Sequence, residues 1–382
     1  MSEHITGVGI VGCGTFVSAY MNTLGKIYKN VKVVCCSDLD VERAKAVAAE
    51  YGIPKACTTE ELLADPAVEI VLIITPPGSH YALSMAALRA GKHVYCEKPM
   101  AATFAQAQEI AAFAKEQGLF TACAPDTFLT PELQGVRRAI DEGKIGRVTS
   151  FTANVCWAGS DLWHPHADFL FKKGGGPMLD IGPYFLTALI ALLGPLDEVF
   201  AYSNRAWDLR HIHDHDCEVE VDTNYCGVLK FKNGAVGSVN FSNDIWKNSL
   251  PALELYGTEG VIYAPNPNTI RGPMKLMQAA PLKADIAATD DLFQKMTLIY
   301  ANDASMERYF QPLEPVGEAR GNQRGLGVAD LAAAIVEGRK PRVSAELCLH
   351  ATEAVMALSG AEGFTLPHKL QTSCSRPEAT SD

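Results

Sequence analysis

The sequence predicts a doubly wound α/β domain with a parallel sheet over residues 1–124, followed by an α+β domain over residues 125–382. The 382 residues exceed the size at which a single core usually stops growing. The first third alternates short apolar runs with helical patterns, whereas the remainder contains successive strand-like runs without helices between them. Such hairpins favour a large, open and mostly antiparallel sheet.

The first domain contains five apolar runs that are typical of buried parallel strands: Gly7–Val11, Val31–Ser37, Glu69–Thr75, His93–Cys96 and Leu119–Cys123. Helical patterns rich in Ala and Leu lie between them: Thr15–Tyr28, Val41–Tyr51, His80–Ala90 and Phe104–Gln117. Strands that are apolar throughout and separated by helices indicate a parallel sheet covered on both faces. Because a connection from one parallel strand through a helix to the next is almost always right-handed, we expect the doubly wound topology.

The second domain begins with helical patterns at Pro131–Gly143 and Leu179–Leu193. Strands are predicted at Cys226–Lys232, Ala235–Phe241 and Leu253–Gly257, with a hairpin turn at Asn233-Gly234. A loop at Ala264–Lys275, helices at Gly327–Glu337 and Ala345–Leu358, and a frayed polar tail at Thr372–Asp382 complete the prediction. We expect this domain to bind the substrate and, through its sheet, to form a homodimer or homotetramer.

Composition narrows the partners and the compartment. The net charge of −11 argues against nucleic acid and anionic membranes as partners. No apolar run approaches the roughly 20 residues that span a bilayer. The eleven cysteines contain no C-x-x-C pair and indicate reduced thiols. The polar start Met1–His4 lacks the pattern of a signal peptide, so we expect a cytoplasmic protein.

A glycine turn follows the first strand. Gly12 permits a tight turn, and Gly14 lets backbone amides approach a pyrophosphate at the start of a helix. The third glycine of this Rossmann fingerprint is absent, because Val17 takes its place. Thr15 and Phe16 come directly after the turn and are candidate cofactor contacts. An ordinary strand-to-helix turn is the alternative interpretation.

Asp38 ends the second strand, where a carboxylate accepts hydrogen bonds from the adenosine ribose. A carboxylate there repels a 2′-phosphate, which favours NAD over NADP. The alternative is that Asp38 caps the helix beginning near Val41, in competition with Asp40.

Two further turns lie at the carboxyl edge of the predicted parallel sheet. Thr75, Pro76 and His80 follow the third strand and are candidate cofactor contacts, although His80 is also an ordinary residue for a first helical turn. Glu97-Lys98-Pro99 follows the fourth strand. We expect Glu97 and Lys98 to lie beside the nicotinamide, whose positive ring, together with burial, lowers the pKa of Lys98. A surface lysine in a turn is the alternative.

Taken in order, GVGIVGCG, Asp38, ITPPGSH, EKP and GGGPMLDIGPY resemble the glucose-fructose oxidoreductase, inositol dehydrogenase and rhizopine catabolism (Gfo/Idh/MocA) family of NAD(P)-dependent oxidoreductases. The resemblance covers nearly the whole chain, from about residue 5 to about residue 360. It implies that Lys98 is catalytic and that Asp180 and Tyr184 bind substrate and relay the proton. Many members have His where this chain has Tyr184, so the chain resembles the Tyr-type branches.

Residue chemistry supports the same assignment. Asp180 and Tyr184 are four residues apart, so one helical face can carry both, but Pro183 between them either kinks or begins that helix. A phenol has a pKa near 10 and needs a nearby cation to act as a base, which Lys98 can supply. The alternative for Tyr184 is an ordinary buried aromatic beside Phe185.

Three polar or aromatic residues are further candidates for substrate contact. Trp163 and His164 precede the glycine run, and their ring types suit sugar C–H and hydroxyl groups. Asn154 is predicted on a sheet strand that faces the cleft. A loop that simply packs on the sheet is the alternative.

Three histidines alternate along one short segment: His211, His213 and His215. On a single strand they would share one face and could bind a metal. Nothing else in the chain requires a metal, and we predict none.

The sequence therefore predicts an NAD-dependent dehydrogenase of the CH–OH type. Its expected substrate is a small carbohydrate-like molecule, and it oxidises a secondary hydroxyl of a sugar, polyol or glycoside, or reduces the matching ketone. The alternatives are an NAD-assisted glycoside hydrolase or lyase, a dihydrodiol-type dehydrogenase, and a non-catalytic dinucleotide-binding regulator.

Overall fold

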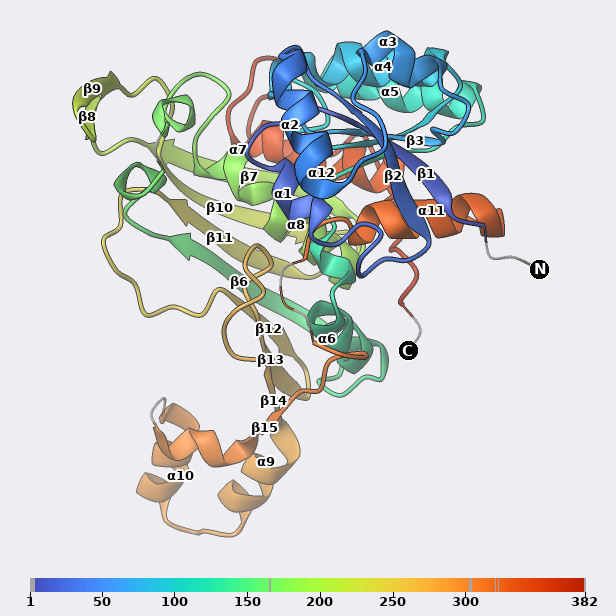
Figure 1. Ribbon diagram of the computed structural model, residues 1–382. Helices are drawn as coiled ribbons and strands as arrows, with labels where there is room; N and C mark the ends of the chain where they lie inside the picture. The colour runs from blue at the N-terminus through green and yellow to red at the C-terminus, as the bar shows by residue number, and fades with distance from the viewer. Residues whose placement is uncertain (1–3, 165, 302–303, 320, 322, 381–382) are drawn as a thin grey trace.

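The computed structural model describes residues 4–164, 166–301, 304–319, 321 and 323–380 (Figure 1). Within these residues the N-terminal sheet has five parallel strands in the order β2-β1-β3-β4-β5. Their bounds are β1 Thr6–Val11, β2 Val31–Ser37, β3 Ile70–Ile73, β4 His93–Cys96 and β5 Thr121–Cys123. The predicted doubly wound parallel sheet is confirmed. All of β1 and β3 is buried, as expected for strands covered on both faces.

The helices of this half are α1 Val17–Met21, α2 Val41–Tyr51, α3 Thr59–Ala64, α4 His80–Arg89 and α5 Phe104–Glu116. The helix predicted over Thr15–Tyr28 is wrong, because α1 ends at Met21. The chain then turns on Thr23, whose carbonyl accepts hydrogen bonds from the amides of Ile27 and Tyr28. The Thr23 hydroxyl donates to the carbonyl of Arg324 at 2.6 Å, so a distant segment holds this turn.

The described part of the C-terminal half contains a sheet of nine strands in the order β15-β14-β13-β12-β6-β11-β10-β7-β16. The bounds are β6 Val148–Cys156, β7 Leu196–Asn204, β10 Asn224–Phe231, β11 Val236–Ser242, β12 Leu253–Gly257, β13 Gly260–Ala264, β14 Lys275–Gln278, β15 Phe310–Pro312 and β16 His368–Lys369. Among the paired strands described, β6 and β11 run parallel and the remaining pairs are antiparallel, which confirms a large, mostly antiparallel sheet. Asn233-Gly234 forms the predicted hairpin turn between β10 and β11.

Helices from the second half cover one face of this sheet. They are α6 Pro131–Asp141, α7 Pro177–Asp180, α8 Gly182–Leu193 and α12 Ala345–Leu358. Helix α11 Leu326–Glu337 instead packs against the first half, where Asn30 donates to its Ala329 carbonyl and a Cβ on its Gly327 would meet Tyr95 of β4. Phe185 of α8 packs edge-on against Phe241 of β11, with ring centroids 5.5 Å apart. Helix α12 contacts α8 and β7 on one side and α5 and β5 on the other, so it lies between the two sheets (Figure 1). The domain boundary at residue 124 stays a prediction.

Two features of the second half were not predicted. Helices α9 Ala279–Ala287 and α10 Leu292–Tyr300 form an arm that projects from the edge of the sheet between β14 and β15 (Figure 1). A short hairpin, β8 Leu209–Ile212 with β9 His215–Glu218, lies outside the main sheet. The described 3₁₀ helices are η1 Pro77–Ser79, η2 Thr127–Leu129, η3 Ser160–Leu162, η4 Asp168–Leu170 and η5 Ala304–Tyr309.

The tail predicted to fray is instead packed over its described residues. The Thr372 amide donates to Glu353, Arg376 donates to the carbonyl of Ala191, and the Thr380 amide donates to Gln134. The prediction failed because the polar groups of the tail form hydrogen bonds with partly buried protein groups instead of with solvent. Among the helices of the described residues, none is both long and apolar enough to cross a membrane.

Candidate active site

The glycine turn after β1 leaves room for a ligand on one side only. Gly12 has a φ of +103°, and a Cβ there would lie 2.9 Å from the carbonyl oxygen of Ile74. A Cβ on Gly14 would meet no protein atom within 4 Å, and Thr15 and Phe16 beside it are exposed. The turn is therefore closed against the sheet at Gly12 and open at Gly14. This shape fits a dinucleotide pyrophosphate, as the sequence predicted.

Asp38 lies against this turn. One carboxylate oxygen accepts a hydrogen bond from the Cys13 amide at 2.7 Å, and the other accepts from the Asp40 amide at 2.9 Å. The cap of α2 is Asp40, whose side chain accepts from the amides of Glu42 and Arg43. The interpretation of Asp38 as the helix cap is therefore wrong. Its carboxylate is held beside the open side of the glycine turn, where a ribose would lie.

His80 connects two of the predicted turns. Its Nδ1 lies 2.7 Å from the carbonyl of Pro99, and its Nε2 lies 2.8 Å from the carbonyl of Thr75. The side chain is fully buried and both ring nitrogens contact backbone carbonyls, so its contact with the cofactor stays a prediction. His80 fixes the Thr75 turn to the turn that carries Lys98. Pro76, the residue after Thr75, is exposed.

Glu97 is buried, and each of its carboxylate oxygens accepts a hydrogen bond from a neighbour. The Tyr20 hydroxyl donates to one oxygen at 2.7 Å, and the Lys98 amide donates to the other at 3.0 Å. The Glu97 amide in turn donates to the Ile73 carbonyl of β3. These contacts fix the backbone from which the Lys98 side chain projects.

Lys98 forms an ion pair with Asp180. Its Nζ donates to Asp180 Oδ1 at 2.7 Å and to the Asp180 carbonyl at 3.0 Å. Burial opposes the charge on Lys98, but Asp180 and Tyr184 outweigh it and hold the pKa of the lysine above its ordinary value. The expectation of a lowered pKa is therefore wrong for the protein by itself, because the sequence could not show how closely Asp180 approaches.

Asp180 and Tyr184 do not share one helix. Asp180 ends α7, and Pro183 lies in the first turn of α8, so the proline begins a helix rather than kinking one. The two side chains still reach the same place, since Lys98 Nζ lies 5.9 Å from the centre of the Tyr184 ring. The structure thus brings Lys98, Asp180 and Tyr184 together by a helix break.

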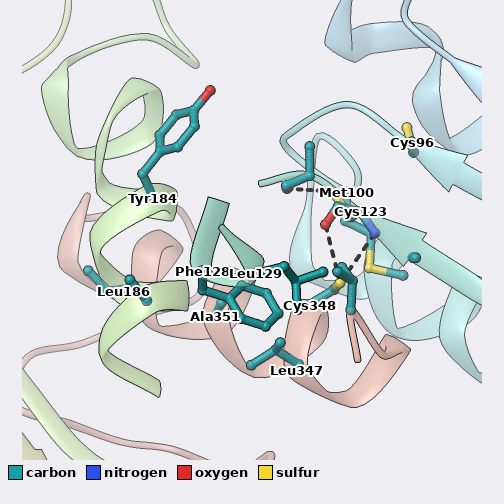
Figure 2. Packing of buried hydrophobic residues seen from close by; sticks show 14 of the residues in the cluster. Cys96, Met100, Cys123, Phe128, Leu129, Tyr184, Leu186, Leu347, Cys348 and Ala351 are labelled. Carbon is teal, nitrogen blue, oxygen red and sulfur yellow. Dashed lines mark hydrogen bonds between the residues drawn. The ribbon is translucent and has the colours of Figure 1, made fainter. Parts of the chain in front are cut away.

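A fourth residue, Arg324, completes the cluster and was missed by sequence reasoning. Its Nη2 donates to the Tyr184 hydroxyl, and its guanidinium carbon lies 5.1 Å from the ring centre. Burial raises the pKa of Tyr184, while Arg324 and Lys98 oppose that rise. Figure 2 shows the Tyr184 hydroxyl directed away from the apolar side chains around Phe128 and Leu129. The one sequence signal was a lone Arg before Gly325 at the start of an apolar helix.

Two other candidate substrate residues, Trp163 and His164, lie in a loop that adjoins the site. This loop follows β6, and the two rings meet edge-on at 5.5 Å. The Trp163 side chain is exposed, whereas the His164 carbonyl accepts from His213. The backbone of this loop at Phe169 packs where a Cβ on Gly175 would lie, so the loop adjoins the glycine run before Asp180.

Asn154 was expected to face the cleft, and this is wrong. Along β6 the side chains alternate, and the buried residues Phe151, Ala153 and Val155 occupy the face covered by helices. Asn154 lies on the opposite face, where Asn240 donates to its amide oxygen. Its own amide nitrogen donates to the Pro251 carbonyl. The sequence could not fix which face of the sheet is covered.

The three histidines near residue 213 are not on one strand. His211 lies within β8, His215 is the first residue of β9, and His213 lies in the turn between them with a φ of +55°. His211 contacts Asp216, and His215 contacts Asp168. The single-strand arrangement is therefore wrong. No group of three or more His, Cys, Asp or Glu with metal-binding geometry occurs among the residues that the structure describes.

Comparison with known proteins agrees with this geometry. Residues 6–123 match the oxidoreductase family with an NAD-binding Rossmann fold, and residues 133–263 match the GFO/IDH/MocA C-terminal domain. The trans-1,2-dihydrobenzene-1,2-diol dehydrogenase of Bos taurus is 30% identical over 66% of this chain and 72% of its own length. The 1,5-anhydro-D-fructose reductase of Ensifer adhaerens is 30% identical over 68% of this chain and 75% of its own length.

Solved structures share the fold. An aldose-aldose oxidoreductase from Caulobacter crescentus complexed with glycerol has a TM-score of 0.73 at 22% identity, covering 94% of this chain and 97% of its own. A levoglucosan dehydrogenase in complex with NADH and L-sorbose has a TM-score of 0.72 at 21% identity, covering 93% and 97%.

The open glycine turn after β1 and the family matches together identify an oxidoreductase with an NAD-binding domain. The chain belongs to the Gfo/Idh/MocA family, with an NAD-binding Rossmann fold in its first half. The family and the oxidoreductase class predicted from the sequence are confirmed.

Proposed function

We propose that the protein oxidises a secondary hydroxyl of a sugar, polyol or glycoside, or reduces the matching ketone, with Lys98, Asp180 and Tyr184 handling the proton. The observation that carries this proposal is the 2.7 Å ion pair between Lys98 and Asp180, with Tyr184 beside it, next to the dinucleotide turn. A cluster of two protonated groups and a carboxylate can exchange a proton with a substrate oxygen. A site that only bound a nucleotide would not need these groups.

NAD is the cofactor that these residues fit. The amides at Gly14, Thr15 and Phe16 would hold its phosphates, while Gly12, whose amide donates to the Ser37 carbonyl, would shape the turn, and Asp38 would accept from the adenosine ribose. The negative charge of Asp38 supports NAD over NADP, because it would lie against a 2′-phosphate. Thr75, Pro76 and Glu97 would contact the cofactor from the turns that follow β3 and β4, which His80 joins and the second of which carries Lys98. When bound, NAD supplies the acceptor or donor of the hydride.

The chain's own residues would move the proton. Lys98 donates two hydrogen bonds to Asp180, which fixes the ammonium beside the phenol and leaves its third hydrogen for a substrate oxygen. Tyr184 would take the proton from the substrate hydroxyl as the phenolate during oxidation and, as the phenol so formed, return it during reduction. Asp180 would hold the lysine charged and orient it. Trp163 and His164 stay candidates for substrate contact from the adjoining loop.

The test is NADH formation by the purified protein with NAD⁺ and a panel of sugars, polyols, glycosides and dihydrodiols. The proposal predicts turnover with one carbohydrate class and its loss in Lys98→Met. Released aglycone from a glycoside without net NADH would assign an NAD-assisted hydrolase or lyase instead. NAD binding without turnover in either assay would favour the regulator.

A dihydrodiol is the second candidate substrate. The relatives of 30% identity include dihydrodiol dehydrogenases, and the loop beside the site exposes the aromatic side chains of Trp163 and Phe169. Aromatic faces suit a cyclic diene as well as a sugar ring. Preference for trans-dihydrodiols over every sugar in the same panel would select this candidate.

We also propose a homodimer or homotetramer through the outer face of the large sheet. Tyr202, Val228 and Val236 are exposed there, on three neighbouring strands. A single species near 41.2 kDa in light scattering would contradict this. The proposed compartment is the cytoplasm, and the eleven cysteines, all of which are described and free, support it.

A further inference from the structure

We propose that Arg324 is a positioning residue that orients the Tyr184 phenol and polarises its oxygen for proton exchange with the substrate. This inference rests on the proposed function, in which Tyr184 exchanges that proton. Arg324 comes from the C-terminal part of the chain, 140 residues after Tyr184, and its guanidinium reaches the site from the side of the dinucleotide turn.

The backbone of Arg324 is firmly held. Its carbonyl accepts the Thr23 hydroxyl at 2.6 Å, and the next residue, Gly325, has a φ of +91° and packs on Thr23 and Leu24. Two residues on, the Gly327 amide donates to Asp126 at 2.7 Å. Arg324 and the residues directly after it are thus fixed to Thr23, Leu24 and Asp126. A long side chain delivered from fixed backbone keeps its head group in one place at a smaller entropic cost.

The guanidinium group of Arg324 contacts the Tyr184 phenol through both a hydrogen bond and its ring face. Nη2 donates to the Tyr184 oxygen, and the guanidinium stacks 5.1 Å from the Tyr184 ring and 5.9 Å from the Phe16 ring. Because the phenol oxygen accepts this bond, its own hydrogen is left for another acceptor. None of the described residues accepts it. The substrate oxygen is the acceptor that the proposed reaction would bring.

A second nitrogen of the same head group also lacks a partner. Nη1 of Arg324 is buried, and no described residue accepts a hydrogen bond from it. An unpaired buried donor is costly unless something binds to it. It lies between Phe16, beside the dinucleotide turn, and Tyr184. A ligand oxygen held between cofactor and phenol would satisfy it.

Nearby charges and burial together set how readily the Tyr184 phenol loses its proton. Lys98 and Arg324 favour loss of its proton, whereas burial and the carboxylate of Glu97 oppose it. Asp180 neutralises much of the Lys98 charge at 2.7 Å. Arg324 is therefore the cation that acts most directly on Tyr184, and its removal leaves a buried phenol beside Glu97. The pKa of Tyr184 should then rise further.

The test is a spectroscopic titration of the phenol in the protein without cofactor or substrate. The difference in tyrosinate absorbance between the protein and its Tyr184→Phe variant reports Tyr184. In Arg324→Met this transition should move up by about one pH unit or more, and in Arg324→Lys by less. Arg89→Met is the matched control. Arg89, at the end of α4, also stacks on an aromatic ring, but that ring is Phe113 and not Tyr184.

Turnover provides the second readout. The acid limb of kcat/KM for oxidation should move to higher pH in Arg324→Met, with a loss of about 10-fold or more near neutrality that added guanidinium partly restores. An unchanged Tyr184 titration in folded Arg324→Met or Arg324→Lys would overturn the inference. A protein without turnover on any substrate would overturn the proposed function, yet the titration would still decide the role of Arg324.

Discussion

Lys98 Nζ donates to Asp180 Oδ1 at 2.7 Å, although the two residues are 82 positions apart in the chain. Lys98 projects from the turn after β4 of the parallel sheet, and Asp180 ends α7 over the antiparallel sheet. The pair therefore joins the half of the molecule that holds the cofactor to the half expected to hold the substrate. A substitution at either residue should therefore change the pKa or the position of the other.

Asp180→Asn should separate the charge of this pair from its geometry. The amide oxygen still accepts from Lys98, but the largest charge that raises the pKa of the lysine is gone, and only Tyr184 and Glu97 then oppose the effect of burial. The pKa of Lys98 should fall, so the basic limb of the pH profile should move to lower pH by about one unit, with about a 10- to 100-fold loss of kcat/KM. Steady-state rates over pH measure both, and an unchanged basic limb would count against the pair.

Gly14→Ala should weaken cofactor binding without harming the fold. The new methyl group meets no protein atom within 4 Å, so the melting temperature should be unchanged. It would, however, occupy the space in which the pyrophosphate approaches the backbone, and the Kd for NADH should rise about 10-fold or more. Fluorescence titration with NADH measures this. Gly12→Ala is the contrast, since its strained φ and close contact with Ile74 should destabilise the protein itself by about 1–3 kcal/mol.

Asp38→Asn should shift cofactor preference towards NADP. The amide can still accept from the Cys13 amide, whereas the charge that repels a 2′-phosphate is removed. Arg43 lies 3.9 Å from Asp38, and its Nη2 donates to Asp40 at 3.3 Å, so this cation is already held near the position that the phosphate would take. The ratio of kcat/KM for NADP to that for NAD should rise about 10-fold. Glu42→Gln removes the same charge from an exposed site on α2 and should leave the ratio alone; equal effects would refute the ribose role.

Stability should fall as the pH drops below 6.5 because of His350. This ring is fully buried, its Nε2 accepts from the Leu196 amide at 2.9 Å, and burial lowers its pKa to about 4. Between pH 6.5 and 4 the unfolded state therefore binds more protons than the folded state. The free energy of unfolding should decrease by roughly 2 kcal/mol between pH 7 and pH 5.

Urea unfolding at both pH values measures the effect of His350. The variant His350→Gln keeps an acceptor for Leu196 but does not titrate, so its stability should change less over this interval. A wild-type protein equally stable at both pH values would contradict the assignment. The contribution of the Glu353 carboxylate, whose hydrogen bonds outweigh burial and lower its pKa, should be lost only at still lower pH.

Local pattern was enough to predict the parallel sheet and the hairpin at Asn233-Gly234, whereas the grouping of Lys98 with Asp180 and Tyr184 followed from the family resemblance of their motifs. Each depends on residues close in sequence or on a motif. Features set by distant contacts were not predictable. The end of α1 depends on Thr23 meeting Arg324, and the outward direction of Asn154 depends on which sheet face α8 covers. Arg324 itself has no fixed spacing from Tyr184, so only the folded chain shows their contact.

The most direct test of the account is NADH formation with NAD⁺ and the substrate panel, compared between the natural protein and Lys98→Met. The account predicts turnover with one class of hydroxyl compound and a loss of about 100-fold or more in the variant, whose NADH affinity stays similar. Equal turnover by Lys98→Met and the natural protein would contradict the central claim that Lys98 and its partners handle the proton.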